Sequence, residues 1–280
     1  MNIMRIVVLA DNRKISSDFQ IEHGLCIYIE TDQHKILLDT GASDIFIQNA
    51  KKLGVNLKAV DYVFISHGHS DHIGGLSFFL ELNTKAKVIM SSVIQNQSYF
   101  SKRDGLHSIS TKFDFDTYRK RIIFVDKELL ITDGIQIYTN QSKKCATPLG
   151  NKNLFKKEDN GELILDDFNH ELIFTIGKEK LLVYTGCAHN GLLNILETVT
   201  MSTSIPINWV LGGFHLLAPR KEILYESESE ITAIGNALQS QYSKTIFLTG
   251  HCTGENAFTT LSQILTNHLI QFYCGYSENI

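Results

Sequence analysis

The segment VFISHGHSDHIGGL, residues 63–76, constrains this chain of 280 residues more than any other. An apolar run typical of a β-strand is followed by three histidines and one aspartate within six residues, and then by two glycines. A strand that ends in HxHxDH directs these side chains into the turn at the sheet edge, where we expect them to converge. Imidazole nitrogens and carboxylate oxygens are ligands that zinc-like and iron-like ions prefer, and the composition is not that of a generic solvated turn. The segment therefore predicts four metal ligands, His67, His69, Asp71 and His72.

The composition predicts a folded chain with a sizeable core. Hydrophobic residues make up 43% of the sequence and charged residues 20%, and there are only three prolines, which argues against a large disordered segment. The length lies within the range of a single layered domain, which we expect to comprise residues 1–280. A formal net charge of −4 without a long basic run predicts neither a nucleic-acid nor a membrane partner. The expected partner is a small-molecule substrate, and the oligomeric state stays open.

The apolar stretches and the cysteines indicate a cytoplasmic location. The stretch Ile3–Ala10 is far too short for a membrane span, and the opening MNIMRIVVLADN lacks a small-residue cleavage site, so it predicts a first strand. The five cysteines are odd in number and scattered, with no CxxC pair. This pattern argues against a disulfide framework and favours a reducing compartment.

Short β-branched runs alternate with helical patterns along both halves of the chain. In the first half, a helix is expected over Ser43–Leu53 with Ser43 as its cap, and another from about Ile73 to Leu82. In the second half, a GKE turn joins two strands into a hairpin. The predicted strands are Arg5–Leu9, Leu25–Glu30, Lys35–Leu38, Tyr62–Ile65, Lys87–Met90, Glu171–Ile176, Lys180–Tyr184, Asn208–Leu211 and Thr245–Thr249. The later helices are Gly191–Thr200, Ser227–Leu238 and Asn256–Leu265.

This order of elements predicts an α+β fold with two sheets packed together and helices outside. Residues from about 92 to 165 break the pattern, because the stretch is polar and shows no regular element over much of its length. A long irregular insert in a compact domain is usually a functional lid or a disordered loop. We expect this insert to select the substrate.

HxHxDH after an apolar strand resembles the metallo-β-lactamase superfamily, and His67, His69, Asp71 and His72 match its signature positions. The resemblance implies a four-layer αββα sandwich, with two mixed β-sheets flanked by helices. The upstream KILLDTG is similar to an earlier motif of the superfamily, in which the aspartate, here Asp39, supports ligand histidines instead of binding metal.

Three later motifs, GCAHNG, GGFHL and HCTG, resemble one branch of the superfamily in their order and spacing. That branch is the 7,8-dihydropterin-6-methyl-4-(β-D-ribofuranosyl)aminobenzene-5′-phosphate synthase-like group. The resemblance implies that His189 and His251 are further metal ligands, since each leaves an apolar strand. Cys187 stands where many relatives carry a metal-bridging aspartate. It either contributes a thiolate or is a small buried residue beside the ligand His189, and we favour the second of these roles.

His215 follows a strand beside two glycines, and we expect it to contact the substrate or transition state, with metal ligation and a structural role as less favoured readings. His170 precedes a strand, which argues against ligation. The remaining histidines, His23, His34, His107 and His268, have no supporting pattern and are expected at the surface or in packing roles.

These residues predict a metallo-hydrolase with two divalent metal ions, zinc being preferred over iron or manganese. Two such ions lower the pKa of water toward neutrality, Asp71 accepts the proton, and His215 stabilises charge on the departing oxygen. The expected substrate is a small anionic molecule. The branch instead implies a transferase that releases pyrophosphate. A di-iron redox module would need a flavin partner domain, and a nuclease of this fold would need a basic groove; the sequence indicates neither. A metal-binding protein without turnover stays open as an alternative.

Overall fold

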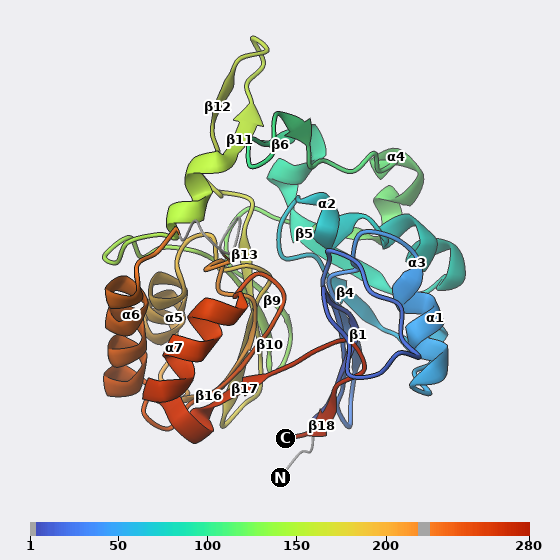
Figure 1. The fold of residues 1–280 in the computed structure, drawn as a ribbon. Helices are drawn as coiled ribbons and strands as arrows, with labels where there is room; N and C mark the ends of the chain where they lie inside the picture. Colours follow the sequence, from blue (N-terminus) through green and yellow to red (C-terminus); the bar gives the residue numbers. More distant parts are fainter. Residues whose placement is uncertain (1–3, 218–224) are drawn as a thin grey trace. The chain divides into compact units, whose positions relative to one another are not determined.

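The computed structural model describes residues 4–217 and 225–280, which form two compact units (Figure 1). The first unit comprises Met1–Tyr99, Ser108–Asp126 and Phe272–Ile280, and the second comprises Phe100–His107 and Lys127–Gln271. Each unit contains a seven-stranded mixed sheet. No helix among the described residues has the length and apolar character needed to cross a membrane. The expectation that residues 1–280 behave as a single domain stays a prediction.

The sheet of the first unit has the strand order β18-β1-β2-β3-β4-β5-β8. Its strands are antiparallel from β18 to β3 and parallel from β3 to β8. The five strands predicted here are confirmed to within one residue at each end, because each is a short apolar run bounded by polar residues. The bounds are β1 Arg5–Ala10, β2 Cys26–Glu30, β3 Lys35–Leu38, β4 Tyr62–Phe64, β5 Lys87–Ser91, β8 Ile122–Val125 and β18 Ser277–Asn279.

Two helices of the first unit, α1 (Ile45–Lys52) and α3 (Leu76–Leu82), bury apolar side chains in its core. The predicted cap is wrong, because α1 begins after Asp44 while the Ser43 hydroxyl donates to Glu22 Oε2 at 2.5 Å.

The helix expected from about Ile73 to Leu82 is confirmed, but it begins three residues later, at Leu76. The structure has two helices, α2 (Ser70–Ile73) and α3 (Leu76–Leu82), separated at Gly74 and Gly75. A Cβ at Gly75 would lie 2.1 Å from the carbonyl oxygen of Thr40. The glycines therefore allow the histidine turn to approach the loop after β3.

The sheet of the second unit has the order β17-β16-β15-β14-β13-β10-β9. Strands β14 to β17 are parallel, and β13 and β14 form the antiparallel hairpin that the sequence predicts. The bounds are β9 Leu129–Thr132, β10 Ile135–Thr139, β13 Leu172–Ile176, β14 Leu181–Thr185, β15 Ile207–Gly212, β16 Ile246–Thr249 and β17 Leu269–Gln271.

Three helices, α5 (Leu192–Ser202), α6 (Glu228–Gln241) and α7 (Glu255–Leu265), lie along one side of the second sheet (Figure 1). Their buried side chains, among them Ile195 and Leu261, form one core cluster with residues of β14, β15 and β16. Fully burying a side chain of this size contributes about 1.5–3 kcal/mol. The helices therefore hold the parallel strands in place, and with them the loops that follow these strands.

Residues 92–165 are not irregular, so this expectation is corrected. They include β8 of the first sheet and β9 and β10 of the second, together with α4 (Phe115–Tyr118). A third sheet has the order β12-β11-β6-β7. The strands of this third sheet have two to four residues each and leave little local pattern; their bounds are β6 Tyr99–Ser101, β7 His107–Ser108, β11 Leu154–Lys157 and β12 Leu163–Leu165.

Candidate metal centre

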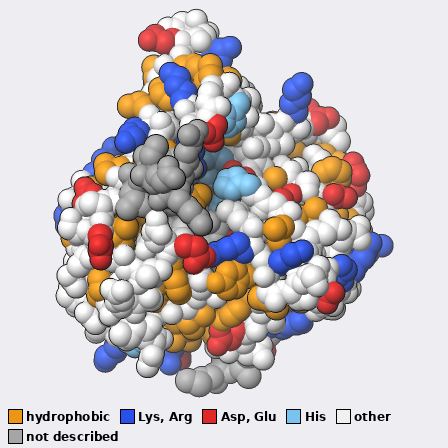
Figure 2. Space-filling model, viewed as in Figure 1, with side chains coloured by type: hydrophobic (Ala, Val, Ile, Leu, Met, Phe, Trp, Pro, Cys, Tyr) orange, Lys and Arg blue, Asp and Glu red, His pale blue; other side chains and the backbone are white. Residues whose placement is uncertain are grey.

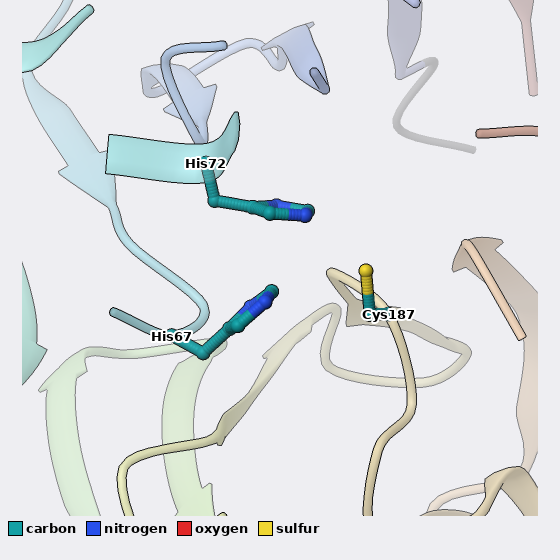
Figure 3. A group of neighbouring side chains, drawn as sticks. All are labelled: His67, His72 and Cys187. Carbon is teal, nitrogen blue, oxygen red and sulfur yellow. The ribbon is translucent and has the colours of Figure 1, made fainter. Parts of the chain in front are cut away.

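The HxHxDH segment gathers its three imidazoles in the first unit. His67 and His69 lie in the loop after β4, and His72 lies in α2. The ring centroids of His67 and His72 are 4.1 Å apart, and those of His67 and His69 are 4.6 Å apart. All three side chains are buried. Figure 3 shows the His67 and His72 rings turned toward the same side of the loop. The turn thus holds three ligand-type side chains away from bulk water.

Asp39, directly after β3, fixes two of these imidazoles. Its Oδ1 accepts the backbone N–H of Ser66 at 2.7 Å, and its Oδ2 accepts the Ser66 hydroxyl at 2.7 Å and His72 Nδ1 at 2.6 Å. A carboxylate only accepts hydrogen bonds, so His72 carries its proton on Nδ1. The Ser66 hydroxyl donates to Asp39 and therefore accepts from His67 Nδ1 at 2.9 Å. Both rings consequently present the lone pair on Nε2, which is the form that binds a metal.

Asp71 lies beside two imidazoles of the first unit. Its Oδ2 is 3.5 Å from His72 Nε2 and 3.3 Å from His23 Nε2. Its side chain is 17% exposed, whereas that of His23 is 56% exposed. The sequence expected His23 in a surface or packing role, and no spacing or neighbouring motif indicates that it contacts Asp71.

In the second unit, the candidate ligands follow three adjacent parallel strands. Cys187 and His189 follow β14, His215 follows β15, and His251 follows β16. The carboxyl ends of parallel strands meet at one edge of a sheet, which is why these loops converge. Ligand atoms of Cys187, His189 and His215 all lie within 4.8 Å of one another, and so do those of Cys187, His251 and Cys252. The unit therefore brings sulfur and imidazole donors together, and it leaves open whether Cys187 is a thiolate ligand or a buried neighbour of one.

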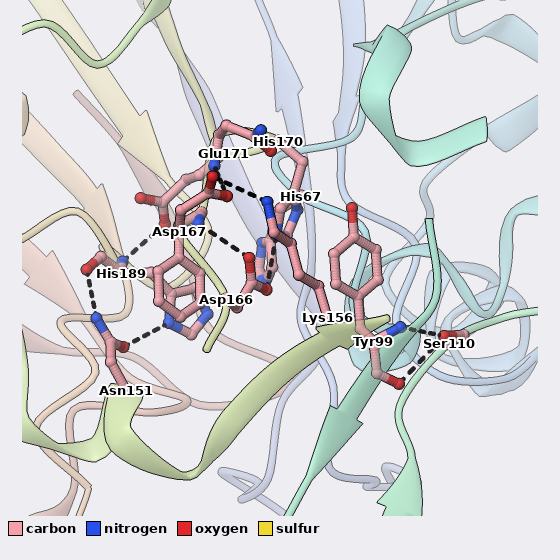
Figure 4. A network of polar contacts seen from close by, with 12 residues as sticks. His67, Tyr99, Ser110, Asn151, Lys156, Asp166, Asp167, His170, Glu171 and His189 are labelled. Atoms are coloured by element: carbon pink, nitrogen blue, oxygen red, sulfur yellow. Dashed lines mark hydrogen bonds and ion pairs between the residues drawn. The ribbon is translucent and has the colours of Figure 1, made fainter. Parts of the chain in front are cut away.

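Hydrogen bonds fix the orientation of His189 (Figure 4). Asn151 Nδ2 donates to the His189 carbonyl at 2.8 Å, which directs the amide oxygen of Asn151 to His189 Nδ1 at 3.1 Å. This oxygen only accepts, so His189 also carries its proton on Nδ1 and presents the lone pair on Nε2. The buried Glu171 accepts the backbone N–H groups of His189 and Asn190 at 2.7 and 2.8 Å. Burial raises the pKa of Glu171, and these donors oppose the rise.

Sequence reasoning missed Asn151 and Glu171, because an asparagine and a glutamate at these positions have no distinctive spacing. His170 Nε2 lies 3.1 Å from Asp166 Oδ2, and both side chains are buried (Figure 4). This contact is in keeping with a packing role for His170. His34 packs edge-on against Tyr62, and His107 is exposed.

Several residues of the candidate site have left-handed backbone conformations. The φ angles are 54° at Asp39, 53° at His215 and 49° at His251. Such angles are strained for residues other than glycine, and they persist where the surrounding structure fixes them. The loops after β3, β15 and β16 are therefore shaped to direct specific side chains.

Asn151→Ala is expected to lower the affinity for divalent metal by about 10-fold, because His189 loses the group that holds its ring and tautomer. Titration against a metal-binding indicator measures the change. Asn160→Ala is the matched control, since Asn160 is an exposed turn residue. Equal affinity in the wild type and Asn151→Ala would contradict the positioning role.

Comparisons with known proteins place these residues in a family. The model of the metallo-beta-lactamase superfamily matches residues 21–150. The solved structure of Tm1679, described as a metal-dependent hydrolase of the beta-lactamase superfamily, is 31% identical, covers 99% of each chain and has a TM-score of 0.80. The chain belongs to the metallo-beta-lactamase superfamily. The fold class predicted from the sequence is thereby confirmed.

A curated relative supports the predicted branch of the metallo-beta-lactamase superfamily. The 7,8-dihydropterin-6-methyl-4-(beta-D-ribofuranosyl)-aminobenzene-5'-phosphate synthase of Methanocaldococcus jannaschii is 28% identical over 280 residues, or 92% of this chain and 90% of the relative. The structure of YhfI from Bacillus subtilis, at 11% identity and a TM-score of 0.57, is similar in fold alone. Membership of the superfamily implies that the chain binds divalent metal, and the Nε2 lone pairs of His67 and His72 in the first unit, and that of His189 in the second, are donors of the type that such ions bind.

Proposed function

We propose that this chain is a metal-dependent hydrolase that acts on a small anionic substrate. His67, His69, Asp71, His72, His189 and His251 serve as ligands of two divalent ions, with zinc preferred over iron or manganese. The observation that carries the proposal is the common anchoring of His67, His72 and His189 through Nδ1. These hydrogen bonds place the proton on Nδ1 and the lone pair on Nε2 of each ring, the arrangement found in histidines that ligate a metal.

The carboxylate of Asp71 acts as the general base of the proposed hydrolysis. When bound, divalent ions of this kind lower the pKa of water to about 7 and polarise a substrate oxygen. Asp71, whose Oδ2 lies 3.5 Å from His72 Nε2, then accepts the proton of the attacking water. His215 stabilises the charge that develops on the departing oxygen.

Charge and cysteine chemistry support a small-molecule substrate and a cytoplasmic location. Acidic and basic side chains are interspersed on the face shown in Figure 2, and the net charge is −4. Nucleic-acid binding would favour a basic surface instead. Among residues 4–217 and 225–280, which include all five cysteines, no disulfide is formed, as expected in a reducing compartment.

The second candidate function is a synthase reaction that releases pyrophosphate. Its support is the identity of 28% to the archaeal synthase, which extends over nine-tenths of both chains. The ligand residues determine how metal is bound. The residues that line the substrate pocket determine whether water or an aromatic carbon acts as the nucleophile.

Two measurements test the proposed function. Elemental analysis of the purified chain is expected to give two divalent ions, and a screen of phosphodiesters, pyrophosphates and lactones is expected to find hydrolysis. The same screen includes a pterin diphosphate with the aromatic ribofuranosyl acceptor. Condensation without hydrolysis would establish the second candidate.

His69→Ala is expected to remove metal and turnover, because His69 is buried within the imidazole cluster. His268→Ala, at the end of the last helical segment, is the matched control and should retain both. Two retained ions in His69→Ala would refute the ligand assignment.

A further inference from the structure

Arg103 lies against His215 within the second unit. One terminal nitrogen of its guanidinium, Nη2, is 2.9 Å from His215 Nε2. The guanidinium carbon lies 6.0 Å from the centre of the Tyr225 ring, and Lys152 Nζ lies 5.2 Å from the same centre. Asn153 Nδ2 donates to the Tyr225 hydroxyl at 2.8 Å. The cations of Arg103 and Lys152 therefore both contact the Tyr225 ring, and the hydrogen bond from Asn153 fixes the position of this ring.

The contact with Arg103 determines the protonation of His215. A guanidinium only donates hydrogen bonds, so His215 Nε2 accepts and its proton lies on Nδ1. This is the neutral tautomer, and the Nε2 lone pair is already engaged by Arg103. His215 thus differs from His67, His72 and His189, which present Nε2 to a metal, and the arrangement favours a donor role for His215 over ligation.

The guanidinium retains donor capacity toward a ligand. Its Nε atom is buried and has no hydrogen-bond partner among the described residues. Residues 4–217 and 225–280 also provide no carboxylate that forms an ion pair with Arg103. A buried donor of a charged group without an acceptor is costly, and the planar Nε–Nη edge of arginine matches the two oxygens of a phosphate or carboxylate.

We propose that Arg103 binds a phosphate or pyrophosphate group of the substrate through its Nε edge and holds His215 in the tautomer that donates from Nδ1. Lys152 Nζ lies 5.2 Å from the centre of the same Tyr225 ring, so a second cation contacts the ring that Arg103 contacts. The inference rests on the proposed function and narrows its substrate class to phosphorylated molecules. Arg103 belongs to the insert that the sequence expects to select the substrate.

The test compares Arg103→Met with Lys102→Met in the full-length, metal-loaded protein. Methionine retains an apolar stem and removes the charge and all donors. Lys102 is the neighbouring cation, and its Nζ lies over the Phe155 ring at 3.9 Å. Calorimetric titration with inorganic pyrophosphate is expected to show an affinity weakened by about 10–100-fold in Arg103→Met and unchanged in Lys102→Met.

Further measurements separate this proposal from a structural role and from the proposed function. Metal content and the thermal midpoint of Arg103→Met should match those of the wild type. Histidine-selective ¹⁵N NMR should show the Nδ1 proton of His215 in the wild type and a changed tautomer in the variant. Equal pyrophosphate affinity in the wild type and Arg103→Met would overturn the anion site. Failure of the wild type to hydrolyse any substrate would instead count against the proposed function.

Discussion

Asp39→Asn is expected to lower the affinity for divalent metal by about 10–100-fold and to destabilise the fold by about 1–3 kcal/mol. Asparagine tolerates the left-handed backbone at this position, where φ is 54°, so the effect comes from the side chain. The amide has one acceptor oxygen, whereas both oxygens of Asp39 accept hydrogen bonds from buried donors. In either orientation, the amide NH₂ faces the backbone N–H of Ser66 or the His72 ring. One buried donor is left unsatisfied, or His72 changes its tautomer.

Chelator competition measures the metal affinity of Asp39→Asn, and urea denaturation of the metal-free chain measures its stability. Asp61→Asn is the matched control in the same unit, because Asp61 accepts from the backbone N–H of Lys35 and from Lys85 Nζ, a partly exposed pair. This control should bind metal as the wild type does. Equal affinities in the two variants would show that Asp39 does not act through the histidines.

The sequence predicts the strand framework and the clustering of the HxHxDH imidazoles well, because both depend on local patterns. Strand β4 and the HxHxDH segment are adjacent in the chain, and an apolar run followed by clustered ligands is visible without a structure. The break between α2 and α3 is less visible, since it depends on the close approach of Gly75 to Thr40. Helical periodicity cannot report such a contact.

The residues that orient the candidate ligands could not be predicted from spacing. Asn151 and Glu171 contact His189 across 38 and 18 positions of the chain. Asparagine and glutamate are common in turns and at strand ends, so their types alone indicate nothing. The strands within residues 92–165 were missed for a related reason: β8 is only four residues long, and its partner β5 lies more than thirty residues earlier. Short strands with distant partners leave a weak local signal.

The residues with left-handed backbone conformations lie in loops that follow strands and carry side chains of the candidate site. Asp39, His215 and His251 each follow the carboxyl end of a strand in a parallel part of a sheet. Sheet pairing fixes where the strand ends, and the strained residue turns the side chain at that point. The strained residues therefore determine where these three side chains point.

Asp71→Asn is expected to lower kcat by about 10²–10⁴-fold, the contribution typical of a general base. Asparagine retains an oxygen that can ligate a metal, but it cannot accept a proton at neutral pH. Much of the metal should therefore remain bound, whereas Asp71→Ala should lose metal as well. Elemental analysis measures the metal that each variant retains. Steady-state kinetics on the best hydrolysed substrate measures kcat.

The pH dependence of kcat provides a second test of Asp71. A carboxylate base loses activity as it becomes protonated, so the part of the acid-side fall in rate that occurs while elemental analysis still finds the metal bound should disappear in Asp71→Asn. His23→Gln is the matched control, because His23 lies 3.3 Å from Asp71 Oδ2 but is largely exposed. That variant should retain the acid fall and most of the rate. An acid-side fall that persists in Asp71→Asn while the metal stays bound would assign the base to another group and leave Asp71 as a ligand alone.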